Sequence, residues 1–153
     1  MTKKEVAVVE RIPRAKYKLE VKPELCTGCM RCALICSLVH YSVFSPSLAS
    51  IRIVKKEFVL ESSVDVCRQC LAPSCMVVCP LGAIYADPKT GARVVGKDKC
   101  IGCKLCVDAC LFGMMFFNEE EKKAFKCDLC GGDPQCIKYC PVQAIEYVKV
   151  GRR

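Results

Sequence analysis

The chain has 153 residues, 16 of which are cysteines, and its formal net charge is +8 at pH 7. The length predicts one compact domain, or two very small modules that share a core. The cysteines are counted among the apolar residues, so the aliphatic core is small. Disulfides or bound metals usually stabilise a chain that is short of core. The apolar runs 6–9 and 111–117 are too short for a signal peptide or a membrane span. We therefore expect a cytoplasmic protein without membrane contact, with its thiols reduced.

Several short strands are predicted along the chain. Residues 17–21 alternate between apolar and charged side chains, as in a half-buried strand. Segments 51–54 and 58–60 have the composition of further short strands. Segments 83–85 and 93–95 flank a turn sequence, DPKTG, and this arrangement predicts a β-hairpin. Together with short helices, these strands predict an α+β fold with many loops.

The cysteines form four quartets with none left over, and two kinds of spacing alternate. The first and third quartets have the pattern C-x2-C-x2-C-x3-C, whereas the second and fourth have a longer third gap and a following proline, Pro80 or Pro141. Short helices are predicted to carry the last cysteine of each quartet, and the proline then turns the chain out of its helix. In chain order the quartets are Cys26, Cys29, Cys32 and Cys36; Cys67, Cys70, Cys75 and Cys79; Cys100, Cys103, Cys106 and Cys110; and Cys127, Cys130, Cys136 and Cys140.

This spacing is typical of [4Fe–4S] clusters. Each cluster needs four thiolates, and in two-cluster bacterial ferredoxins the last cysteine of one run binds the other cluster. Zinc is the alternative, because isolated C-x2-C pairs are common in zinc sites. The regular third and fourth cysteines favour iron, and they predict four [4Fe–4S] clusters.

The positive charge does not indicate a nucleic-acid partner. Four oxidised clusters with their thiolates would carry about −2 each, which would balance the excess of lysine and arginine. The aromatic residues also do not alternate with a basic stripe, as a nucleic-acid surface would require.

The quartets carry a resemblance to known families. Quartets two and three resemble a complete two-cluster bacterial ferredoxin, and quartets one and four resemble a second ferredoxin wrapped around the first. This nested order resembles the four-cluster electron-transfer subunits of molybdenum and tungsten oxidoreductases. Within that group, residues 26–54 (CTGCMRCALICSLVHYSVFSPSLASIRIV) closely resemble the small iron–sulfur subunit of tungsten-dependent aldehyde oxidoreductases. The resemblance covers roughly residues 17–148.

The resemblance implies that every cluster takes its fourth ligand from another quartet, so that all sixteen cysteines are iron ligands. The chain departs from the simple ferredoxin pattern at Ser37 and Leu111, which stand where a proline would follow the last cysteine. The implied ligand sets are Cys26, Cys29, Cys32 and Cys140 for cluster 1; Cys67, Cys70, Cys75 and Cys110 for cluster 2; Cys100, Cys103, Cys106 and Cys79 for cluster 3; and Cys127, Cys130, Cys136 and Cys36 for cluster 4.

The nested order also implies a single four-cluster domain over residues 1–153. Its inner module would span about residues 61–115, and its outer module about residues 16–60 plus 116–149. The resemblance implies a non-catalytic subunit of a hetero-oligomer. Its partners would be a large catalytic subunit with a tungsten- or molybdenum-pterin site that oxidises aldehydes to carboxylic acids, and an acceptor such as ferredoxin or a flavin-containing NAD-reducing subunit.

Three other functions remain open at this point. The catalytic partner could be a formate dehydrogenase, a sulfur-compound reductase or an aromatic-ring reductase. The chain could be a freestanding polyferredoxin, or a zinc-binding scaffold. None of these makes the chain itself an enzyme, because no catalytic triad, phosphate loop or pair of catalytic carboxylates is present.

Some residues near the quartets have no assigned role. His40 is the sole histidine, and it is expected on the surface or beside a ligand, because all ligand positions are filled. The apolar run 111–117 is expected to pack in the core over a cluster. The cations beside predicted ligands could raise nearby reduction potentials or could simply be solvated; they are Arg31, Arg68, Lys99, Lys104, Lys126 and Lys138.

Overall fold

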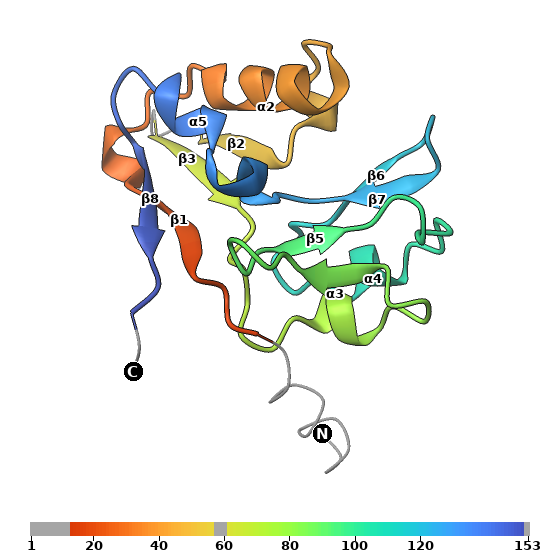
Figure 1. The fold of residues 1–153 in the computed structure, drawn as a ribbon. Helices are drawn as coiled ribbons and strands as arrows, with labels where there is room; N and C mark the ends of the chain where they lie inside the picture. The colour runs from red at the N-terminus through yellow and green to blue at the C-terminus, as the bar shows by residue number, and fades with distance from the viewer. Residues whose placement is uncertain (1–12, 57–60, 152–153) are drawn as a thin grey trace.

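The computed structural model describes residues 13–56 and 61–151. Short helices and strands are joined by loops (Figure 1), which is the loop-rich α and β structure that the sequence predicts. In chain order the elements are β1 (Tyr17–Val21), η1 (Pro23–Leu25), α2 (Arg31–Tyr41), η2 (Pro46–Leu48), β2 (Ile51–Lys56), β3 (Glu61–Val66), α3 (Ser74–Val77), β4 (Ile84–Ala86), β5 (Arg93–Val95), α4 (Leu105–Asp108), β6 (Phe116–Asn118), β7 (Lys123–Phe125), η4 (Leu129–Gly132), α5 (Gln135–Lys138) and β8 (Ile145–Lys149).

The described strands form two-stranded antiparallel sheets, and segments that are distant in sequence lie side by side. The pairs are β1 with β8, β2 with β3, β4 with β5, and β6 with β7. Helices α2 and α5 contact each other, as do α3 and α4. In Figure 1, α2 and α5 lie at the top near β2 and β3, whereas α3 and α4 lie at the lower right near β4 and β5. The helices therefore pair the first quartet with the fourth, and the second with the third.

The strand predicted at residues 17–21 is confirmed as β1. Its central side chain, Leu19, is buried, as the alternation predicts. The ring of Tyr17 stacks on that of Tyr147 in β8, with 4.8 Å between the ring centroids. The strand predicted at 51–54 is likewise confirmed as part of β2.

The predicted hairpin is confirmed as β4–β5, in which Ile84 lies opposite Val95. Its turn is closed by Asp87, whose carboxylate accepts hydrogen bonds from the backbone N–H and the hydroxyl of Thr90, both at 2.7 Å. The turn ends at Gly91, which has a φ of +71°. Glycine is required there because a Cβ would lie 2.6 Å from the carbonyl oxygen of Arg14.

The prediction that helices carry the last cysteine of each quartet is correct for α2, which contains Cys36, and wrong for the other three. In α3, α4 and α5 the helix carries the third cysteine instead, namely Cys75, Cys106 and Cys136. These helices have a single turn and end before the fourth cysteine, which begins a tight turn of its own. In that turn the carbonyl oxygen of the cysteine accepts a hydrogen bond from the backbone N–H three residues later; the cysteines are Cys79, Cys110 and Cys140.

The outcome differs for the predicted strand at 58–60 and for the apolar run 111–117. The strand predicted at 58–60 lies outside the described residues; β3 begins just after them. The run 111–117 packs in the core at Met114 and Met115, as expected, but Leu111 is 87% exposed. The end of this run forms β6, the first strand of a hairpin that the sequence did not predict.

The core has two clusters of buried side chains, and cysteines belong to both. One contains Leu19, Cys32, Ala33, Ala49, Ile51, Val64, Ala92, Leu129, Cys136 and Ile145. The other contains Cys75, Ile84, Cys106, Met115 and Ala124. Within residues 13–56 and 61–151, no helix has the length and apolar character to cross a membrane.

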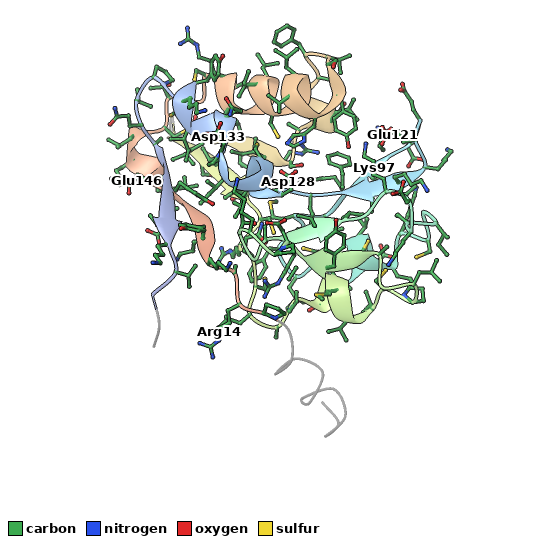
Figure 2. All side chains as sticks on the ribbon, in the orientation of Figure 1. Arg14, Lys97, Glu121, Asp128, Asp133 and Glu146 are labelled. Atoms are coloured by element: carbon green, nitrogen blue, oxygen red, sulfur yellow. The ribbon has the colours of Figure 1, made fainter. Side chains whose placement is uncertain are left out.

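The surface carries ion pairs that link distant loops. Figure 2 shows Lys97, in the loop after β5, beside Glu121, in the turn between β6 and β7. Their charged atoms are 2.7 Å apart. Because both side chains are exposed, this pair contributes little to stability.

Candidate metal centres

Each quartet begins with a C-x2-C loop whose backbone is left-handed just before the second cysteine. The left-handed residues are Gly28, Gln69, Gly102 and Leu129, with φ values of 68°, 50°, 73° and 60°. A Cβ on Gly102 would lie 2.4 Å from the carbonyl oxygen of Lys122, so this position has no room for a side chain. A Cβ on Gly28 would lie 2.5 Å from Ser62 Oγ, so the Ser62 side chain would have to move. The left-handed residue turns the chain back on itself, so that cysteines on both sides of it can face one cavity.

Three cavities are each lined by four cysteines. In each, three cysteines come from one quartet and the fourth comes from another. The cavities contain Cys26, Cys29, Cys32 and Cys140; Cys100, Cys103, Cys106 and Cys79; and Cys127, Cys130, Cys136 and Cys36. The other lining residues are mostly apolar and include Ile53, Ile84 and Leu19. Four sulfur donors in an apolar pocket form a donor set suited to an iron–sulfur cube shielded from water.

The remaining four cysteines, Cys67, Cys70, Cys75 and Cys110, also lie close together. Burial is the largest cause of the raised pKa of Cys70 and Cys75, and the thiolates of Cys67 and Cys110 raise both values further. Three groups of four cysteines therefore line cavities, and the four that remain affect one another's pKa values. Each of these sets has three members from one quartet and one from another.

Backbone N–H groups donate to the sulfur of the last cysteine in each quartet. The N–H of Ala83, Met114 and Ala144 donates to the sulfur of the cysteine four residues earlier, each at 3.2 Å. In the first quartet the donor is distant in sequence, since the N–H of Ser50 donates to Cys36 Sγ at 3.3 Å. Such bonds stabilise a negatively charged sulfur and orient it toward a metal.

Burial makes these thiols hard to ionise without a metal. It raises the pKa of Cys32, Cys106 and Cys130 to about 11, and the pKa of Cys136 to about 12. Neighbouring cysteine thiolates raise all four pKa values further. The negative charge of four adjacent sulfurs can therefore be accommodated only with a cationic centre, so the donor sets fit iron–sulfur clusters, whose assembly would release the protons.

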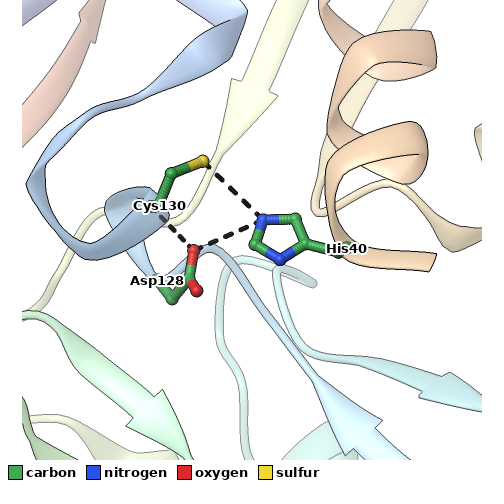
Figure 3. A group of neighbouring side chains, drawn as sticks. All are labelled: His40, Asp128 and Cys130. Atoms are coloured by element: carbon green, nitrogen blue, oxygen red, sulfur yellow. Dashed lines mark hydrogen bonds and ion pairs between the residues drawn. The ribbon is translucent and has the colours of Figure 1, made fainter. Parts of the chain in front are cut away.

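His40 lies beside one of these cysteine groups (Figure 3). Its Nε2 is 3.7 Å from Cys130 Sγ and 3.5 Å from the Oδ1 atom of Asp128. The same carboxylate oxygen accepts a hydrogen bond from the backbone N–H of Cys130 at 2.8 Å. The cavity beside His40 already has four cysteines, so the geometry supports the prediction that His40 lies beside a ligand rather than acting as one.

Two cations are buried near the group that contains Cys67. Lys126, which the sequence places beside a predicted ligand, is 7% exposed. Arg93 is fully buried, and the sequence does not place it beside a ligand. An arginine in a short strand next to a turn is normally solvated, so no pattern in the sequence marked it. The other cations that the sequence places beside ligands (Arg31, Arg68, Lys99, Lys104 and Lys138) are exposed.

Comparison with known proteins identifies the family. Residues 58–150, more than half of the chain, match the family described as "4Fe-4S dicluster domain", and residues 23–41 match the "4Fe-4S binding domain" family. These matches include residues of all four quartets.

Similar proteins support this assignment. The chain is 35% identical over 133 residues to the "Aliphatic sulfonate oxidoreductase, polyferredoxin-like subunit" of Pyrococcus furiosus, across 85% of this chain and 75% of that protein. It is 33% identical over 139 residues to the "Thiosulfate reductase electron transfer subunit PhsB" of Salmonella typhi, across 80% and 70%. The BamBC complex of benzoyl coenzyme A reductase with zinc has a similar fold, with a TM-score of 0.53 and 21% identity over 92% of this chain and 83% of that chain. The chain therefore belongs to the 4Fe-4S dicluster family of ferredoxin-type electron-transfer proteins, and it binds [4Fe–4S] clusters.

Proposed function

We propose that the chain is a non-catalytic electron-transfer subunit that carries four [4Fe–4S] clusters with crossed ligand sets. The supporting observation is that three cavities are each lined by three cysteines from one quartet and one from another. The ligand sets are those of clusters 1 to 4, and they would make residues 1–153 one domain with an inner and an outer module. Each cluster supplies one-electron chemistry, and the protein supplies burial and N–H···S bonds that tune it.

The contacts among the cysteines support an order for the clusters along the molecule. Cys32 of cluster 1 and Cys36 of cluster 4 lie one turn apart on the same face of α2. Repulsion from Cys67 of cluster 2 raises the pKa of Cys127 of cluster 4, after the larger effect of burial. Repulsion from Cys75 of cluster 2 likewise adds to the raised pKa of Cys106 of cluster 3. The proposed order is therefore cluster 1, cluster 4, cluster 2, cluster 3.

The exposure of the cysteines supports the same order. Of the sixteen, Cys29 and Cys103 are exposed, while the rest are partly or fully buried. Cys29 belongs to cluster 1 and Cys103 to cluster 3, which are the two ends of the proposed row. Electrons would therefore enter at one of these clusters and leave at the other.

The proposed partner is a tungsten-pterin aldehyde oxidoreductase subunit, because residues 26–54 resemble the small subunit of that family. Electrons would pass from that subunit, in the cytoplasm, to ferredoxin or to a flavin-containing NAD-reducing subunit. The second candidate is a catalytic subunit that acts on sulfur compounds. It is favoured by the names of two relatives, which are subunits of enzymes for an aliphatic sulfonate and for thiosulfate.

Two measurements test this function. Anaerobically prepared protein should contain about sixteen iron and about sixteen acid-labile sulfide per chain; a preparation dominated by zinc would refute the clusters. Purification from the native host should also recover a much larger catalytic chain. Assays of that larger chain with aldehydes and with sulfur oxyanions distinguish the two candidate partners. Recovery of this chain alone, as a stable monomer, would instead indicate a freestanding polyferredoxin.

A further inference from the structure

Arg93 is a buried cation next to the second quartet. It lies in β5 and its side chain is fully buried. Its Nη1 donates to the carbonyl oxygen of Gly91 at 2.5 Å, and its Nη2 donates to that of Cys70 at 3.1 Å. Its Nε is buried and has no hydrogen-bond partner. Within the part of the chain that the structure describes, no carboxylate lies at ion-pair distance from it.

Such a residue is unfavourable unless an anion is close, because burial removes the solvation of its charge. Burial lowers the pKa of Arg93, and the thiolates of Cys75, Cys67 and Cys70 oppose that effect. All three belong to the proposed ligand set of cluster 2. An anionic centre bound by these cysteines would supply the missing counter-charge.

The position of Arg93 is fixed by a second buried polar residue. Gln69, which is 4% exposed, accepts a hydrogen bond from the backbone N–H of Arg93 at 2.8 Å. Its Nε2 donates to the carbonyl oxygen of Cys127 at 3.0 Å. Gln69 lies between two cysteines of the second quartet, so the loop that carries these cysteines is tied to the strand that carries the arginine.

Lys126 is a second buried cation near the cysteines of cluster 2. It is 7% exposed and lies directly after β7. Its ammonium lowers the pKa of both Cys70 and Cys75, against the larger effect of burial. Among the lysine and arginine side chains that the structure describes, Arg93 and Lys126 are the buried ones. The buried positive charge of the described structure therefore lies beside one cysteine group.

We propose that Arg93 and Lys126 are built-in counter-ions that make cluster 2 the most easily reduced of the four. This inference rests on the proposed function, since it assumes that the four groups hold clusters. Reduction adds one electron and takes a cluster with its thiolates from about −2 to about −3. A nearby buried cation stabilises the more negative state more strongly, and solvent screens this attraction little. In the singly reduced protein the electron would then be found mainly on cluster 2, an inner cluster of the proposed order.

The test compares Arg93→Gln with Arg68→Gln in a redox titration followed by electron paramagnetic resonance. Arg68 is the matched control, because it adjoins Cys67 of the same cluster but is exposed and stacks over Phe112, with 4.4 Å between its Cζ and the ring centroid. The signal of cluster 2 is identified as the one altered in a Cys110→Ser variant. It should appear first during reduction of the wild type. Arg93→Gln should lower its reduction equilibrium constant at least about ten-fold, or about 59 mV for one electron. Arg68→Gln should change it much less.

Two further variants test whether the buried charge itself is responsible. Arg93→Lys, which keeps the charge, should shift the signal less than Arg93→Gln. If Arg93→Gln does not assemble, Lys126→Gln must shift the same signal in the same direction. The inference is overturned if cluster 2 is not the first to be reduced, or if the buried and exposed charges have equal effects. Iron and sulfide analysis of the same samples separates this failure from failure of the proposed function: a wild type without four clusters refutes the function itself.

Discussion

At the scale of single residues, Cys79, Cys110 and Cys140 share one local arrangement. Each begins a tight turn, and each sulfur accepts a hydrogen bond from the backbone N–H of the residue four positions later. These backbone N–H groups stabilise the sulfur and orient it. This arrangement allows each of these cysteines to serve a cluster whose other ligands come from another quartet.

Replacing Cys79 with serine tests this arrangement. If ligation is crossed, Cys79→Ser exposes one iron of the cluster held by Cys100, Cys103 and Cys106. A three-iron cluster or an oxygen-ligated cube is then expected. Electron paramagnetic resonance should therefore show the same altered signal in Cys79→Ser and in Cys103→Ser.

The reciprocal variants serve as the control. Cys110→Ser and Cys70→Ser should alter a second signal, and neither pair should directly change the signals of clusters 1 and 4. If Cys79→Ser instead alters the signal that Cys70→Ser alters, ligation is local and the crossed arrangement is wrong.

At the scale of the elements, the loops determine the sites more than the helices do. The C-x2-C loops turn back at a left-handed residue, and three of the helices have only a single turn. A helix of one turn is too short for its own hydrogen bonds to stabilise it. Its position therefore depends on the loop before it and the turn after it.

Gly102→Ala is expected to destabilise the site of cluster 3. The left-handed backbone alone costs alanine about 1–2 kcal/mol, and the contact of its Cβ with the carbonyl oxygen of Lys122 adds about 1–3 kcal/mol. Gly113→Ala is the matched control, because Gly113 has a φ of +63° but no atom within 4 Å of its Cβ position. Thermal loss of the cluster absorbance should therefore occur at a clearly lower temperature in Gly102→Ala; equal midpoints would contradict the close packing at Gly102.

The sequence predicted the elements whose signal is local. The alternation at 17–21 and the turn at Asp87 were sufficient, because each depends on neighbouring residues. The helices were assigned to the wrong cysteine in three quartets, since single-turn helices show no periodicity. The β6–β7 hairpin was missed because its first strand ends an apolar run that is also compatible with core packing.

The sequence predicted only part of the candidate site. The spacing of the cysteines predicted four clusters, but it did not indicate which quartet donates each fourth ligand; that expectation came from the family resemblance alone. Arg93 could not be predicted at all. Its backbone N–H donates to Gln69, 24 residues earlier in the chain, and its Nη2 donates to the carbonyl oxygen of Cys70, so its position depends on contacts that are distant in sequence.

At the scale of the whole molecule, the metal sites occupy the place of an aliphatic core. Both clusters of buried side chains include cysteines, such as Cys32 in one and Cys75 in the other. The strands form pairs rather than larger sheets, and an isolated two-stranded pair is marginally stable in water. We therefore expect bound clusters to supply much of the stability of the fold.

Removal of the clusters should unfold the chain. Without metal, the cysteines leave apolar cavities and the remaining core is thin, so cluster binding is expected to supply much of the folding free energy. Circular dichroism and limited proteolysis of the apoprotein, compared with the holoprotein, measure this directly. A compact, protease-resistant apoprotein would show that the side-chain core suffices without metal.

The central claim is that four cubes are held by crossed cysteine sets, and iron anomalous scattering from crystals of the anaerobically prepared holoprotein tests it most directly. The map should contain four cube-shaped iron sites in the order cluster 1, cluster 4, cluster 2, cluster 3. Cys79 should be bonded to the cube of Cys100, Cys103 and Cys106. A map with fewer than four cubes, or with Cys79 bonded to the cube of Cys67, Cys70 and Cys75, would contradict the claim.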